Sequence, residues 1–165
     1  MEEQVIYGFN QTDVWYNRDV GIADQLLETF RLNPGRAAVI FEGRRISYQE
    51  LEEYSLKTAR GIVGRTGDRK GTVAVHMRRT EKIFTALCGI ILSGNSWLLI
   101  NRELPAQRKR EMVCDSQALF CICTEPAEEM SGCVELVQLD ELADADEMPD
   151  CETTEYLSLI HIYIQ

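Results

Sequence analysis

The segment TEKIFTALCGIILSGNSWLLINRELP, residues 80–105, constrains the fold more than any other part of the chain. Between Ile83 and Leu92 its apolar residues surround a helix instead of forming one stripe, so we expect this helix to be interior. Thr80 is its predicted N-cap, and Gly94 is expected to be left-handed just beyond its end. The unbroken apolar run at 97–100 is typical of a parallel strand buried on both faces. This order predicts an α/β protein.

Helices and strands alternate through the rest of the chain. Helices are predicted at residues 21–33, 47–63 and 105–116, strands at 37–41, 72–77, 118–123 and 134–139, and a hairpin turn at 42–45. In the first of these helices Ile22, Leu26 and Phe30 form the predicted apolar face. Such alternation predicts a largely parallel sheet flanked by helices and built from right-handed crossovers. Residues 1–20 have neither periodicity, and we expect an extended lead-in there.

The strongest local signal is Ile46-Ser47-Tyr48-Gln49-Glu50-Leu51. Ser47 and Glu50 fit a capping box, in which each side chain accepts a hydrogen bond from the backbone amide of the other residue. Ile46 and Leu51 occupy the two positions of a hydrophobic staple. The predicted role is structural, and we assign it no chemistry.

The loop GRTGDRKG at 64–71 contains glycines and basic residues, which are also found in phosphate-binding loops. It follows a predicted helix and precedes a predicted strand, whereas a phosphate loop follows a strand and opens a helix. The reversed order argues against phosphate binding here.

The charge is distributed unevenly. The 165 residues, 45% hydrophobic and 27% charged, are typical of one folded domain. All 17 Lys and Arg lie at or before Arg110, together with 13 acidic residues, whereas residues 111–165 contain 14 acidic residues and no basic one. The basic run 108–110 is short and lies in a predicted helix, so it indicates a solvated face and not a nucleic-acid-binding surface.

The start of the chain and its cysteines indicate the compartment. The N-terminus is acidic where a secretory signal would be basic, and no apolar run is long enough to span a bilayer, so we expect a cytoplasmic protein. Six cysteines are then expected to be reduced: Cys88, Cys114, Cys121, Cys123, Cys133 and Cys151. With only two histidines and no zinc-ligand spacing, we predict no metal site.

Four segments, in order and nearly without gaps, resemble the beginning of an adenylation domain of a nonribosomal peptide synthetase. They are FNQTD, NPGRAAVIFEGRRISYQEL, LSGNSWLLINRELPAQR and MVCDSQALFCICT, and the resemblance extends over residues 9–124. ISYQEL is similar to the first core motif of that family, and residues 92–105 are similar to its second, LKAGxAYxPxDPxYP. The second motif departs from the family at Ser93, Trp97, Leu99, Asn101 and Arg102, where Ala, Tyr, Pro, Asp and Pro are usual.

The resemblance implies that residues 21–156 form a truncated N-terminal part of an AMP-binding adenylation domain. In the complete enzyme an amino-acid carboxylate would attack the α-phosphate of ATP, pyrophosphate would leave, and the aminoacyl group would pass to the phosphopantetheinyl thiol of a carrier protein. ATP and Mg are the implied cofactors. The family's phosphate loop, substrate pocket, ribose-binding Asp and catalytic Lys lie beyond the matched segments. No catalytic, cofactor-binding or metal residue is therefore assigned to this chain, and the chain alone is predicted to be inactive.

Two alternatives remain. Acyl- and aryl-CoA ligases of the same superfamily often have Asn at the position of Asn101, so the parent could belong to that class. The other alternative is a non-enzymatic α/β interaction module, because one fold hosts many functions.

Residues 157–165 form a separate tail. LSLIHI, at 157–162, is what one reading frame of a transposon end used in sequencing libraries would encode, so our hypothesis is that the native sequence ends near Tyr156. The alternative is that YLSLI is the native strand before the phosphate loop, since a five-residue apolar run suits such a strand.

Overall fold

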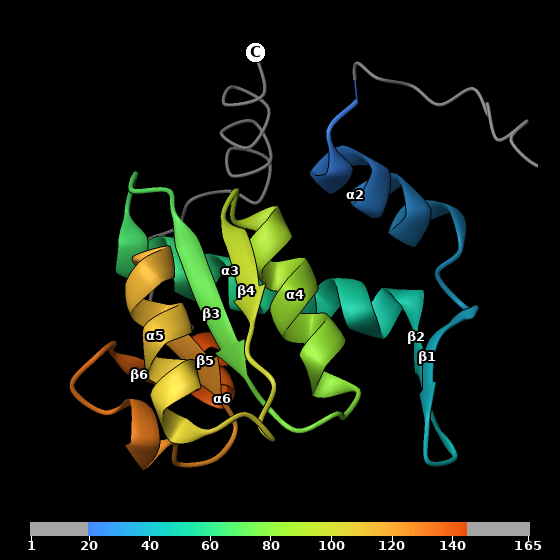
Figure 1. Ribbon diagram of the computed structural model, residues 1–165. Coiled ribbons are helices and arrows are strands. Elements are labelled where there is room, and N and C mark those ends of the chain that lie inside the picture. Colours follow the sequence, from blue (N-terminus) through green and yellow to red (C-terminus); the bar gives the residue numbers. More distant parts are fainter. Residues whose placement is uncertain (1–19, 145–165) are drawn as a thin grey trace, which may run out of the picture.

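The computed structural model describes residues 20–144 (Figure 1). Its helices are α2 (Ile22–Leu32), α3 (Tyr48–Thr66), α4 (Lys82–Leu92), α5 (Ala106–Ser116), the 3-10 helix η1 (Glu128–Met130) and α6 (Leu139–Ala143). Its strands are β1 (Ala37–Phe41), β2 (Arg44–Ser47), β3 (Thr72–His76), β4 (Ser96–Leu99), β5 (Cys121–Cys123) and β6 (Leu136–Gln138). The predicted tail, and all but the last residue of the predicted lead-in, lie outside the described residues.

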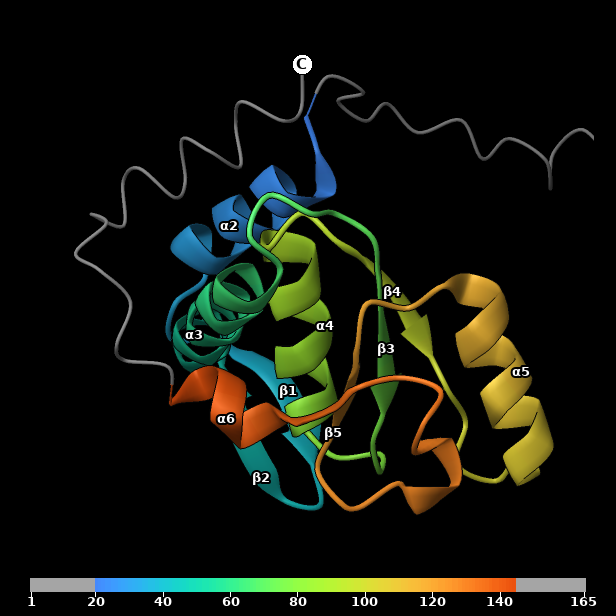
Figure 2. The same cartoon turned by 90° about the vertical axis from the view of Figure 1, so that its left-hand side faces the viewer.

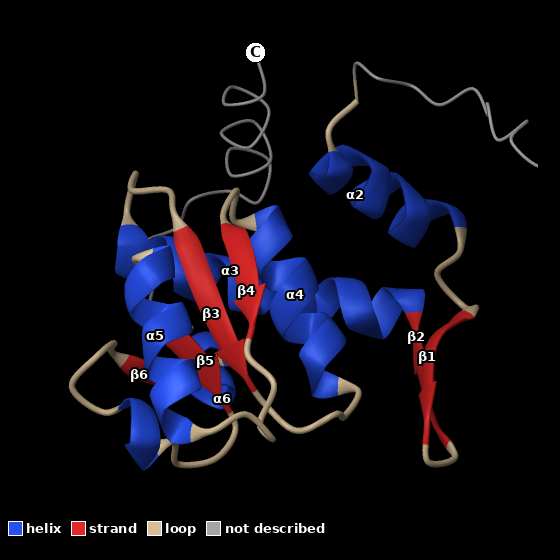
Figure 3. Cartoon of the chain, in the orientation of Figure 1, coloured by secondary structure: helices blue, strands red, loops and turns tan. Residues whose placement is uncertain are grey.

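Four strands form a parallel sheet in the order β4-β3-β5-β6, as the alternation of strands and helices predicts. Ala74 of β3 is in register with Leu98 of β4 on one side and with Cys121 of β5 on the other. β1 and β2 form a separate antiparallel hairpin, which also confirms the prediction (Figure 3). The chain is therefore an α/β structure with a parallel sheet flanked by helices.

Helices cover both faces of the sheet (Figure 2). Val73 and Val75 of β3, which are fully buried, pack in one apolar cluster with residues of α3, α4 and α6. Ala74, between them, belongs to a second cluster that includes Val113 of α5. This alternation along β3 is the two-residue period of a strand with a helical layer on each side.

α2 lies on the far side of α3 and α4 from the sheet, where its buried residues are Ala23, Leu27 and Phe30. The predicted face began with Ile22, and this was wrong, because the side of α2 that contacts α3 is displaced by one residue and leaves Ile22 69% exposed. Phe30, by contrast, is fully buried as predicted.

α4 packs against α2, α3, β3 and β4, so the predicted interior helix is confirmed for most of its surface. Ile90 and Leu92 are fully buried, while Phe84 remains 46% exposed. The predicted Thr80 cap was wrong: the cap position is Glu81, without a side-chain hydrogen bond, and the Thr80 carbonyl accepts a backbone bond from Ile83 at 3.2 Å. A backbone turn therefore begins this helix.

The prediction that residues 97–100 are buried on both faces was wrong for β4. β4 is an edge strand of the described sheet, with Trp97 48% and Leu99 42% exposed. These two residues are in register with Val73 and Val75, so they project from the face that α4 covers over β3. α4 also contacts β4, but it leaves these two side chains partly exposed. Within residues 20–144, no helix has the length and apolar character needed to cross a bilayer.

Candidate functional site

The first motif of the resemblance is the start of α3, and the predicted capping box is present. The Ser47 hydroxyl accepts from the Glu50 amide at 3.2 Å, and the Glu50 carboxylate accepts from the Ser47 amide at 2.8 Å. These bonds from Ser47 hold the pKa of Glu50 below its usual range. Ile46 and Leu51 pack in the same apolar cluster, as expected of a staple. All four side chains thus stabilise the N-terminus of α3.

The second motif is the turn from α4 into β4. Gly94 has φ 72°, which confirms the predicted left-handed residue beyond the helix. The buried Asn95 amide donates to the Ser93 carbonyl at 3.2 Å and accepts from the Gly71 amide at 3.0 Å. Lys70 also donates to the Ser93 carbonyl, at 3.0 Å. The motif thus joins this turn to the loop before β3.

These bonds give the glycine-containing loop at 64–71 a structural role. α3 continues to Thr66, three residues beyond the predicted end at residue 63, and Gly67 (φ 57°) ends it. Because Lys70 and Gly71 are bonded to the turn after α4, the loop braces the amino end of β3.

Asn101 forms the turn that leads into α5. Its side-chain oxygen accepts from the Glu103 amide at 3.1 Å, and its carbonyl accepts from the Leu104 amide at 3.3 Å. An Asp carboxylate at this position can accept the same amide bond. This turn can therefore form with the Asp that peptide synthetases usually have at this position and equally with the Asn of many CoA ligases.

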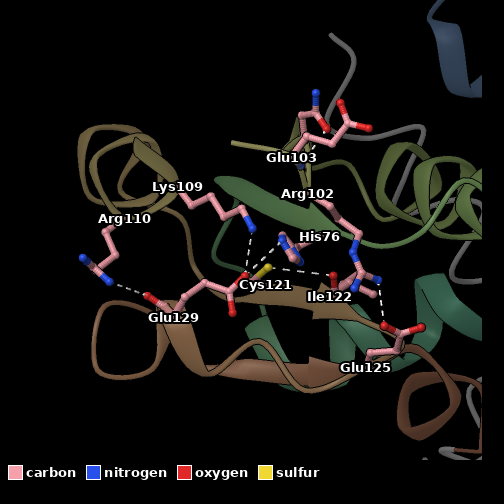
Figure 4. A network of polar contacts seen from close by, with 10 residues as sticks. His76, Arg102, Glu103, Lys109, Arg110, Cys121, Ile122, Glu125 and Glu129 are labelled. Carbon is pink, nitrogen blue, oxygen red and sulfur yellow. Dashed lines mark hydrogen bonds and ion pairs between the residues drawn. The ribbon is translucent and has the colours of Figure 1, made fainter. Parts of the chain in front are cut away.

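The most concentrated polar chemistry lies at the carboxyl ends of β3 and β5 (Figure 4). These strands are neighbours in the sheet, and the helices that follow β3 and precede β5 lie on opposite faces. Ligands of open α/β sheets bind at such a switch point, so this is the candidate site that the fold itself indicates.

Glu129 is the centre of one polar group there. Its carboxylate accepts from the Lys109 ammonium of α5 at 2.9 Å and lies 3.6 Å from Nε2 of His76, at the end of β3. Its backbone carbonyl accepts from the guanidinium of Arg110 at 3.0 Å. The bond from Lys109 is the main cause that lowers the pKa of Glu129.

His76 is buried, and its Nε2 has no hydrogen-bond partner within the described structure. Desolvation is the main cause that lowers its pKa, and the positive charge of Lys109 lowers it further. The carboxylate of Glu129 acts in the opposite direction. The neutral imidazole is thus the favoured form near neutral pH.

Glu125, just after β5, is the centre of a second polar group. It accepts from Arg102 at 2.8 Å and pairs with Arg78 at 2.7 Å. The hydrogen bond from Arg102 is the main cause that lowers the pKa of this carboxyl. Arg78 follows β3, and Arg102 lies between β4 and α5. The two ion pairs of Glu125 therefore join the ends of β3 and β5 to the loop that leads into α5.

We did not predict either polar group from the sequence. One of their residues, Lys109, contradicts the prediction made for the basic run at 108–110. The basic run at 108–110 was predicted to be a solvated face, but Lys109 is only 6% exposed. It lies one helical turn before the buried Val113, on the side of α5 that faces the sheet. That i,i+4 spacing is the signal that could have found it.

The chemical capacity of this site is limited. The bases nearest the strand ends are paired with Glu125 and Glu129, and within the described residues no cluster of three or more His, Cys, Asp or Glu could hold a metal ion. We derive no catalytic step from these residues.

Comparison with known proteins identifies the family. A model described as AMP-binding enzyme matches residues 26–159, which is most of the chain. The chain belongs to this family. Bacitracin synthase 1 of Bacillus licheniformis is 29% identical over 140 residues, which cover 83% of this chain and 3% of the synthase. The recognised resemblance to nonribosomal peptide synthetases is thus confirmed.

Solved structures support the fold. The N-terminal subdomain of Klebsiella oxytoca NpsA, in complex with 3-hydroxybenzoyl-AMSN, matches with a TM-score of 0.69 and 19% identity over 80% of this chain and 33% of that subdomain. O-succinylbenzoate coenzyme A synthetase of Bacillus subtilis matches with a TM-score of 0.66 and 22% identity, over 72% of this chain and 27% of the synthetase. The predicted fold class, part of the N-terminal subdomain of an adenylate-forming enzyme, is confirmed.

Proposed function

We propose that this chain is part of an ATP-dependent ligase that activates an amino acid as its adenylate within a nonribosomal peptide synthetase. The observation that carries the proposal is the family match over residues 26–159, together with the similarity to bacitracin synthase 1. In the proposed reaction the amino-acid carboxylate attacks the α-phosphorus of ATP and pyrophosphate leaves. The aminoacyl group then passes to a carrier-protein thiol, and the enzyme works in the cytoplasm.

The contribution of this chain to that reaction is structural. The capping box, the turn after α4 and the two polar groups fix α3, α4 and α5 against the parallel sheet. ATP and Mg would supply the leaving pyrophosphate and charge neutralisation, and we place the residues that hold them outside the described part of the chain. Catalysis by such enzymes depends on donors preorganised around the reacting phosphate.

An acyl- or aryl-CoA ligase is the second candidate. Its support in the sequence was Asn101, but the amide bond that Asn101 accepts from Glu103 is equally available to Asp. Asn101 therefore does not favour a CoA ligase over a peptide synthetase. A non-enzymatic α/β module is the third candidate, and the family match makes it the weakest of the three.

The test begins with the coding sequence across Glu155. A longer frame that encodes a glycine-rich Ser/Thr loop excludes the non-enzymatic module, and a pocket Asp placed to meet an α-ammonium group favours an amino acid over other carboxylates. If the same codons continue past residue 156, the hypothesis that the tail is not native is wrong.

The completed domain is then assayed for pyrophosphate exchange with pooled amino acids, and separately with aryl and fatty acids plus coenzyme A. We expect exchange that depends on an amino acid, without a CoA thioester. Formation of an acyl- or aryl-CoA product would instead establish the second candidate.

A further inference from the structure

The first half of α5 packs against the segment around η1, and two side-chain contacts join them. Lys109 donates to the carboxylate of Glu129 at 2.9 Å, and Arg110 donates to its carbonyl at 3.0 Å. The chain segments that follow, residues 111–116 of α5 and residues 131–133 after η1, therefore both start from this contact.

Two cysteines continue them. Cys114 lies one helical turn after Arg110 on the same side of α5. Cys133 lies four residues after Glu129, where its amide donates to the Met130 carbonyl at 3.1 Å. Both side chains are exposed, and both are free thiols.

The two thiols also interact with each other. Desolvation raises the pKa of the Cys114 thiol, and Cys133 raises it further through its charge and a hydrogen bond between the two side chains. The other described cysteines are less accessible: Cys121 and Cys123 are buried and Cys88 is half-buried. Burial also raises the pKa of Cys121 to about 12. The described cysteines thus comprise one exposed pair and three less accessible thiols.

We propose that Cys114 and Cys133 form a redox-active dithiol that a low-molecular-weight disulfide such as oxidised glutathione converts to an intramolecular disulfide. One cysteine thiolate attacks a sulfur of oxidised glutathione, the S–S bond breaks and one glutathione thiolate leaves. The other cysteine thiolate then attacks the protein sulfur of the mixed disulfide and releases the second glutathione. Two protein thiols are oxidised and one glutathione disulfide is reduced.

The new bond would close a covalent loop over residues 114–133, which contains β5 and η1. It would lock α5 to the segment that holds Glu129, and therefore to the polar group at the carboxyl end of the sheet. This modification site is independent of the proposed adenylation reaction, because no step of that reaction uses these thiols.

The test uses the reduced 165-residue chain and oxidised glutathione, with iodoacetamide added afterwards to block remaining thiols. Trypsin cannot map the bond, because no Lys or Arg follows Arg110. Cleavage after Glu, which does not occur at the Glu125–Pro126 bond, separates Cys114, in peptide 112–128, from Cys133, in peptide 130–135. We expect these two peptides to be linked, with a mass about 2 Da below the sum of their reduced masses. Because thiolates react, the rate should rise with pH.

Matched variants assign the bond. Cys114→Ser and Cys133→Ser should each abolish the link, whereas Cys121→Ser and Cys123→Ser, in the same peptide as Cys114, should retain it. In denaturing urea other cysteine pairs should form as well, which shows that the native preference depends on the fold. The proposal is overturned if the native chain gives no 112–128 to 130–135 link, if it accumulates only glutathione adducts, or if the link persists in Cys114→Ser.

Discussion

At the scale of single residues, the burial of Ile90 gives the sharpest test of α4. Ile90 is fully buried between α3 and the sheet. A carboxylate there would lose water without gaining a partner, which costs several kcal/mol of a total stability of about 5 to 15 kcal/mol. We expect Ile90→Asp to abolish cooperative thermal unfolding measured by circular dichroism.

Phe84→Asp is the matched control, because Phe84 lies on the same helix and is 46% exposed. It should change the melting temperature much less than Ile90→Asp. A cooperatively melting Ile90→Asp variant would contradict the interior placement of α4.

His76 predicts the pH dependence of stability. Its pKa is lowered in the folded state, mainly by desolvation, whereas the unfolded chain has the ordinary value of about 6.5. The stability that neutral His76 contributes is fully present above pH 6.5. It is lost as the pH falls from 6.5 through the lowered folded-state pKa, because in that range the unfolded chain binds the proton more readily. We expect urea unfolding to show higher stability at pH 8 than at pH 5.

The variant His76→Gln should reduce that difference. His161→Gln is the control for the second histidine of the chain and should leave the difference unchanged. Glu125 and Glu129 affect stability at lower pH than His76 does. Because their pKa values are lowered, the stability that they contribute is lost only as the pH falls below about 4.5. An equal pH dependence in His76→Gln would contradict the assignment.

The sequence predicted local polar contacts and missed distant ones. Ser47 and Glu50 are three residues apart, so the capping box follows from sequence spacing alone. Glu129 is 20 residues from Lys109 and 53 from His76, so their contact depends on how α5 crosses the sheet. No spacing rule contains that information, and the candidate site could not be predicted.

At the scale of elements, α3 approaches α6 so closely that Gly61 is required. A Cβ on Gly61 would overlap the backbone oxygen of Leu142 and lie 2.8 Å from its Cα, and a backbone atom cannot move aside as a flexible side chain can. Ala normally stabilises a helix by about 1 kcal/mol relative to Gly. Here overpacking of about 1 to 3 kcal/mol should outweigh that gain, so Gly61→Ala should lower the urea midpoint.

Gly64→Ala provides the comparison, because Gly64 is exposed in the same helix. It should raise the midpoint slightly. Stabilisation by Gly61→Ala as well would mean that α6 does not contact α3 as described.

The elements themselves were predictable, but their neighbours were less so. Strand and helix alternation predicted the parallel sheet, and the approximate position of each described strand, because hydrophobic period and turn residues are local properties. The apolar run of β4 suggested burial on both faces, yet β4 is an edge strand in the described sheet. An apolar run indicates how much apolar surface a strand has to bury, but not which element buries it.

At the scale of the whole molecule, the chain spans 3% of bacitracin synthase 1 and 33% of the NpsA N-terminal subdomain. Its described residues build a scaffold, and their charged side chains at the strand ends are paired with one another. The central proposal is that this chain is a structural part of an adenylation domain whose catalytic groups lie elsewhere.

Pyrophosphate exchange into ATP tests this claim most directly. The purified 165-residue chain is assayed with all proteinogenic amino acids pooled, beside the completed domain, and ATP binding is titrated by calorimetry. The account predicts exchange by the completed domain, and neither exchange above the no-enzyme blank nor saturable ATP binding by the chain alone. Exchange or saturable ATP binding by the chain alone would contradict the account, and the loop at 64–71 would be the first place to look for the missed site.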